Sequence, residues 1–147
     1  MSLHDWLKSG WLVKHTTSSQ EIADLLGVAD RDLTDYNASG LSPDWRLNIA
    51  YNAALQSATA ALAAAGYRPS RESHHYRVIQ SLAYTIDASP ELIAQFDMFR
   101  KKRNIGGYER AGMVSDHEAN EMVSLAKRLR KDIEYWLRAN HPELFQE

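Results

Sequence analysis

Apolar residues recur along most of the chain at intervals of three and four, the spacing that places them on one face of an α-helix. Five such stripes follow one another, and each is bounded by residues that commonly start or stop a helix. In the last stripe, for example, Met122, Leu125, Leu129 and Ile133 share one face. Helices are therefore expected over about residues 18–40, 42–66, 73–86, 89–106 and 115–140.

The residues at the expected helix starts support this pattern. Ser42-Pro43-Asp44 and Ser89-Pro90-Glu91 each supply an N-cap, a proline at the first helical position and an early acid. Ser115 and Glu118 have the spacing of a capping box. Glycine and proline are few and fall between the stripes, and no Asn-Gly or Asp-Gly hairpin turn is present. We predict an all-α fold, a five-helix bundle of mostly antiparallel helices joined by short loops.

The length of 147 residues suits a single domain that spans residues 1–147. The N-terminal segment, residues 1–17, contains Leu3, Trp6, Trp11 and Leu12, which are too apolar to lie free in solvent. We expect this segment to dock on the bundle or on a second subunit.

Composition excludes several functional classes. The chain has 17 Lys and Arg against 19 Asp and Glu, so a globally cationic nucleic-acid binder is excluded while a local basic patch is not. With no cysteine, zinc-thiolate sites, disulfides and cysteine nucleophiles are impossible. The scattered histidines show no metal-ligand spacing, and no cofactor or metal is expected. The longest apolar run, Ala60–Ala65, is far shorter than the roughly 20 residues of a membrane span, and we expect a cytoplasmic protein without membrane association.

The strongest candidate for chemistry is the basic stretch of residues 100–110. Arg100 and Arg103 are three residues apart, so they lie on one side of a helix and can hold a phosphate or carboxylate between them. Asn104 adds a neutral donor and acceptor, and two glycines at 106–107 let Tyr108 fold back beside Arg103. The alternative is an ordinary helix end, with basic residues that complement the helix dipole.

Two other features have structural alternatives. His74 and His75 are adjacent and point about 100° apart on a helix, so they cannot both face one site. His75 lies on the apolar stripe and is expected in the core or an interface, whereas His74 faces solvent or a cleft. Residues 19–28 resemble the start of a helix-turn-helix, but the segment that would follow carries a net negative charge, so sequence-specific DNA binding is not expected.

The run Asp97-x-x-Arg100-x-x-Arg103-Asn104-x-x-x-Tyr108 resembles the signature of the HEPN family of helical-bundle proteins. That motif is an Arg, a polar residue that is often Asn, several further residues and a His. Residues 50–55, 66–68 and 74–77 also resemble HEPN sequences, so the similarity covers about residues 20–140. By position, Arg103 and Asn104 match the motif, and Tyr108 stands in place of the His.

The resemblance implies a homodimer in which two copies of the motif face one cleft. Active HEPN proteins are metal-independent ribonucleases of toxin–antitoxin and phage-defence systems, and others bind RNA or nucleotides without cleavage, often beside a nucleotidyltransferase. A tyrosine, with a pKa of about 10, is a poor base compared with a histidine of about 6.5.

We therefore expect RNA or nucleotide binding at a dimer cleft, with weak or absent ribonuclease activity. The expected contacts are Arg100, Arg103, Asn104, Tyr108 and His74, and Arg103 and Tyr108 are the catalytic candidates. Two alternatives stay open at this point. One is a non-catalytic interaction protein that partners a nucleotidyltransferase, and the other is an active metal-independent ribonuclease that uses Tyr108 or His74.

Overall fold

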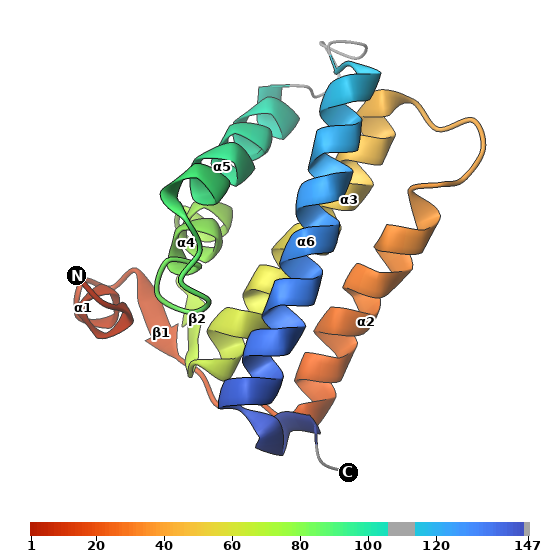
Figure 1. The fold of residues 1–147 in the computed structure, drawn as a ribbon. Coiled ribbons are helices and arrows are strands. Elements are labelled where there is room, and N and C mark those ends of the chain that lie inside the picture. The colour runs from red at the N-terminus through yellow and green to blue at the C-terminus, as the bar shows by residue number, and fades with distance from the viewer. Residues whose placement is uncertain (106–113, 146–147) are drawn as a thin grey trace.

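The fold is a helical bundle, as Figure 1 shows for the computed structural model, which describes residues 1–105 and 114–145. Helix α3 (Pro43–Ala64) packs against both α2 (Ser19–Asp35) and α6 (Asp116–Asn140). Helices α4 (His74–Ser81) and α5 (Pro90–Ile105) lie beside this three-helix unit. The prediction of an all-α fold is confirmed, and α2 to α6 are the five expected helices.

Four of the five predicted helix starts are confirmed by serine caps, whereas Ser73 before α4 makes no side-chain cap bond. The side-chain oxygens of Ser18, Ser42 and Ser89 each accept a hydrogen bond from the backbone N–H three residues later, at 3.1–3.3 Å. Ser115 and Glu118 form the complete capping box at the start of α6. These bonds pair N–H groups that have no carbonyl partner within the helix.

Two predicted helix ends are wrong. Helix α2 ends at Asp35 rather than near Gly40, because the chain tightens into three-residue turns there: the N–H groups of Asn37 and Ala38 donate to the carbonyls of Thr34 and Asp35. Helix α4 ends at Ser81 rather than near Ile86. Asp87 adopts a left-handed conformation (φ 56°), which turns the chain toward α5.

A two-stranded antiparallel sheet was not expected from the sequence. Strand β1 (Leu12–Lys14) pairs with β2 (Tyr67–Pro69), and Val13 lies opposite Arg68. Each strand has three residues, too few for an alternating pattern to be recognised. The sheet forms because the segment after α3 returns to the N-terminal segment.

The N-terminal segment lies against α4 and the turn that follows it. Helix α1 (Leu3–Lys8) buries Trp6, whose ring meets Tyr84 edge-on at 5.3 Å between centroids. The guanidinium of Arg77 in α4 stacks on Trp11, 3.7 Å from the ring centroid. At the other terminus a short 3₁₀-helix, η2 (Pro142–Phe145), follows α6.

Alanine allows the central helices to approach closely. Ala50, Ala54, Ala58 and Ala61 of α3 are completely buried, and α3 makes its most extensive contact with α6. This alanine stripe is thus covered within the same chain. None of the helices in the described ranges is long and apolar enough to cross a membrane.

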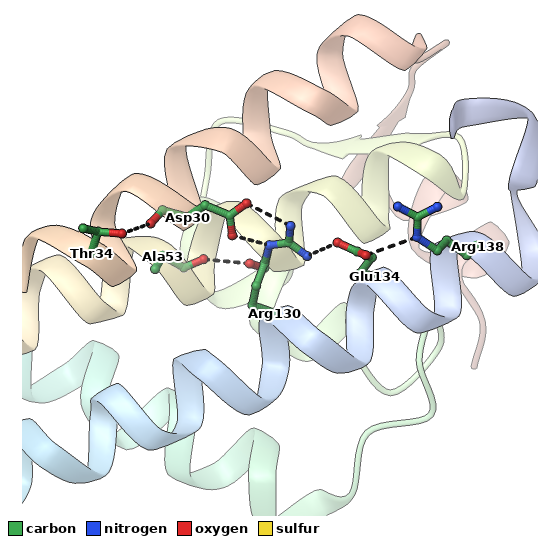
Figure 2. A network of polar contacts seen from close by, with 7 residues as sticks. Asp30, Thr34, Ala53, Arg130, Glu134 and Arg138 are labelled. Carbon is green, nitrogen blue, oxygen red and sulfur yellow. Dashed lines mark hydrogen bonds and ion pairs between the residues drawn. The ribbon is translucent and has the colours of Figure 1, made fainter. Parts of the chain in front are cut away.

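A polar network ties α2 to α6. Arg130 donates to both carboxylate oxygens of Asp30, at 2.9 and 3.0 Å, and to Glu134 at 2.8 Å (Figure 2). Glu134 also accepts a bond from Arg138, one turn further along α6. Two parallel bonds to one carboxylate fix direction as well as distance, so this pair aligns the two helices.

Candidate functional site

The two arginines of the basic stretch lie over aromatic rings from α3 and α4. The guanidinium carbon of Arg103 is 5.0 Å from the centroid of Tyr51, and that of Arg100 is 5.5 Å from the centroid of Tyr76. Their three-residue spacing on α5 places both on one side of the helix. The cluster of these four residues therefore unites three helices that are separate in the sequence.

Tyr51 is the buried centre of this cluster. Only 1% of the residue is exposed, and its ring packs edge-on against Phe96 of α5, with centroids 5.6 Å apart. Its hydroxyl shares a hydrogen bond of 3.2 Å with Nδ1 of His75 in α4. A buried phenol needs such a polar partner, and this bond joins α3 to α4.

The surroundings keep both members of this pair neutral near pH 7. Burial raises the pKa of Tyr51 to about 12, although the charges of Arg103 and Arg100 act in the opposite direction. Burial also lowers the pKa of His75, and electrostatic repulsion by Arg103, His74 and Arg100 lowers it further. The arginines thus supply the positive charge of the cluster, and the Tyr51–His75 pair supplies neutral hydrogen-bonding groups.

The two arginines differ in how their charge is compensated. The Arg100 Nε donates to Oδ1 of the buried Asp97 at 2.7 Å, and Lys101 reaches the other oxygen at 3.5 Å. Among the residues that the structure describes, no carboxylate forms an ion pair with Arg103. Arg103 is therefore the arginine of this cluster that no described carboxylate neutralises.

An open pocket of about 510 Å³ adjoins the cluster. The first turn of α4 and its preceding residue line it (Ser73, His74, His75 and Tyr76), together with Arg100. The first N–H groups of a helix lack carbonyl partners within it and carry a partial positive charge. A helix start beside a guanidinium is chemically suited to a phosphate or a carboxylate.

The structure brings together three of the five predicted site residues: Arg100 and Arg103 on α5, and His74 at the adjoining pocket. Tyr108 and the side chain of Asn104 lie outside the described residues. His75, which was expected in the core or an interface, is half-buried, bonds to Tyr51 and also lines the pocket. Within the described part of the chain, no group of three His, Asp or Glu side chains is placed to hold a metal ion.

Sequence reasoning missed Tyr51, the residue on which the cluster is built. The one signal for it was a phenol within the alanine-rich stripe of the second predicted helix, since a hydroxyl buried there requires a partner. Which residue would be that partner depends on how α3 and α4 pack.

In comparisons with known proteins, no family model, no curated protein and no solved structure matches the chain. The resemblance to HEPN proteins therefore rests on the motif and on residues 50–55, 66–68 and 74–77.

Proposed function

We propose that this protein binds RNA or a nucleotide through phosphate groups at the cluster of Arg100 and Arg103, as a HEPN-like domain without strong ribonuclease activity. In this proposal Arg103 contacts the phosphate directly. Arg100 and the first turn of α4 complete the positive surface around the adjoining pocket.

The observation that carries the proposal is the position of Arg103. It stands over a buried aromatic ring, three residues from a second arginine, with no described carboxylate to neutralise it. An arginine that served only to complement the end of α5 would not need the ring of Tyr51 from a different helix. Partial desolvation by the ring strengthens the attraction of an anion.

Binding is favoured over cleavage by the state of His75, which is bonded to the ring residue beneath Arg103. Cleavage of RNA without a metal needs a base for the ribose 2′-hydroxyl and an acid for the leaving oxygen. Nδ1 of His75 is already bonded to the Tyr51 hydroxyl, and the high pKa of that phenol makes it a poor base at neutral pH. This arrangement suits the phenol and imidazole to support Arg103 rather than to exchange protons with a substrate.

The proposed protein is a homodimer, and this part rests on the HEPN resemblance. The alanine stripe of α3 is used inside the chain, so the shared cleft would be formed by the α5 ends of two copies. Sedimentation should then give twice the 16.7 kDa of one chain. A role in a toxin–antitoxin or defence system belongs to the same proposal.

The decisive experiment is binding of a fluorescein-labelled single-stranded RNA, measured by anisotropy, for wild type and Arg103→Ala. Loss of a charged hydrogen bond costs about 1.5–3 kcal/mol, so affinity should fall at least about tenfold. Arg128→Ala is the matched control, because Arg128 is 70% exposed on α6 and its one ion pair among the described residues, with Asp132, is 3.7 Å long. The control should bind almost as wild type does.

The same RNA on a denaturing gel separates binding from cleavage. We expect the RNA to stay intact with or without a chelator. If wild type binds no RNA or nucleotide and instead forms a stable complex with a nucleotidyltransferase, the protein is an interaction partner and the proposal is wrong.

A further inference from the structure

A second pocket, of about 650 Å³, lies between the β1–β2 sheet, the start of α2 and the end of α3. We call it the sheet pocket. Its wall includes the apolar side chains of Leu25, Leu62 and Tyr67. Because the sheet was not predicted from the sequence, this pocket was not predicted either.

The sheet pocket is rich in positive charge. Arg68 and Arg71 line it, and among the described residues neither arginine has a carboxylate at ion-pair distance. The one carboxylate in its wall, Glu21, already accepts hydrogen bonds from the Thr17 hydroxyl at 2.6 Å and from His15 at 2.7 Å. The pocket thus contains two permanent cations, Arg68 and Arg71, and one carboxylate, which already accepts two hydrogen bonds. This excess of positive charge favours an anionic ligand.

The sheet pocket and the pocket beside Arg100 share a residue. His74 lines both, so the two cavities follow one another along the surface. Each contains an arginine and a tyrosine: Arg68 with Tyr67 in one, and Arg100 with Tyr76 in the other. Alternation of cations and aromatic rings along a groove is how proteins bind single-stranded nucleic acids, whose phosphates and bases repeat at short intervals.

We propose that the sheet pocket is a second phosphate subsite, in which Arg68 and Arg71 bind the phosphate. The two pockets together then take a single strand of several nucleotides rather than a mononucleotide. This inference rests on the proposed function, because it needs Arg103 to hold the first phosphate. A mononucleotide carries its phosphate at one end and would be held at Arg103 and the adjoining pocket beside Arg100, whereas a strand places further phosphates beyond His74.

The test compares two ligands, uridine 5′-monophosphate and a fluorescein-labelled hexauridylate. We expect wild type to bind the hexamer at least about tenfold more tightly than the monophosphate, since the hexamer occupies both subsites. The double variant Arg68→Ala/Arg71→Ala should lose most of this difference and keep its affinity for the monophosphate. Arg103→Ala should weaken the binding of both ligands.

Salt dependence gives a second readout. For single strands the slope of log K against log salt is about −0.7 per neutralised phosphate, so removing one or two contacts should make the hexamer slope shallower by about 0.7–1.4. The matched control is Arg31→Ala/Arg128→Ala, which removes two arginines that are 63% and 70% exposed on α2 and α6. Its slope should stay close to that of wild type.

The outcomes separate the two proposals. If Arg103→Ala weakens binding but Arg68→Ala/Arg71→Ala binds the hexamer as wild type does, the subsite in the sheet pocket is refuted and the proposed function stands. If wild type binds neither ligand, both proposals are wrong. Should the double variant prove less stable by circular dichroism, Arg71→Glu alone must still weaken hexamer binding selectively, because Arg71 lies on the surface.

Discussion

The buried phenol of Tyr51 predicts a specific dependence of stability on alkaline pH. Its pKa lies at about 12 in the folded protein, against an ordinary value of 10.0. The folded state therefore holds this proton more tightly than the unfolded chain does. Between pH 10 and pH 12 unfolding releases the proton, so the free energy of unfolding falls as pH rises through this window.

The magnitude follows from the difference in pKa. A difference of about two pK units corresponds to about 2.7 kcal/mol, fully present below pH 10 and lost by about pH 12. Tyr51→Phe removes the titrating hydroxyl and keeps the ring against Phe96. At pH 7 the substitution also removes the bond to His75 at 3.2 Å, which should cost about 1 kcal/mol.

The assay is urea unfolding of wild type and Tyr51→Phe at a series of pH values from 7 to 11.5. The wild type should start about 1 kcal/mol more stable, and this advantage should shrink and reverse as pH rises above 10. Tyr135→Phe, at a residue that is 79% exposed, controls for the loss of a surface phenol. Equal pH dependence of wild type and Tyr51→Phe would refute the assignment of Tyr51 as a desolvated, neutral phenol.

Three further predictions concern the bundle and the acid range, each measured by denaturant unfolding. Arg130→Met should cost about 1.5–3 kcal/mol, because it breaks three hydrogen bonds to Asp30 and Glu134, whereas Arg128→Met should change stability by less than about 0.5 kcal/mol. Ala58→Leu should cost about 1–3 kcal/mol, since Ala58 is 0% exposed within the α3 alanine stripe, and equal stability to wild type would contradict close packing there. Burial lowers the pKa of His75, so the unfolded chain takes up this proton first, and wild type should lose stability below about pH 6.5 more steeply than His75→Gln.

The sequence by itself determined helices α2 to α6 and where they begin, although it did not predict α1. Serine caps, prolines at the first turn and apolar spacing of three and four are local features, and local hydrogen bonds realise them in the structure. The spacing of Arg100 and Arg103 likewise placed two cations on one side of α5. Where local signals were weak, as at the ends of α2 and α4, the predicted boundaries were wrong.

Only the tertiary structure decided what those cations face. Tyr51 and His75 are 24 residues apart and become partners because α4 folds back across α3. The β1–β2 pairing joins residues 12–14 to 67–69, and the sheet pocket forms only once that pairing exists. Pairing between distant segments depends on packing of the whole chain, because three-residue strands and a single buried hydroxyl have no periodic pattern that a sequence can display.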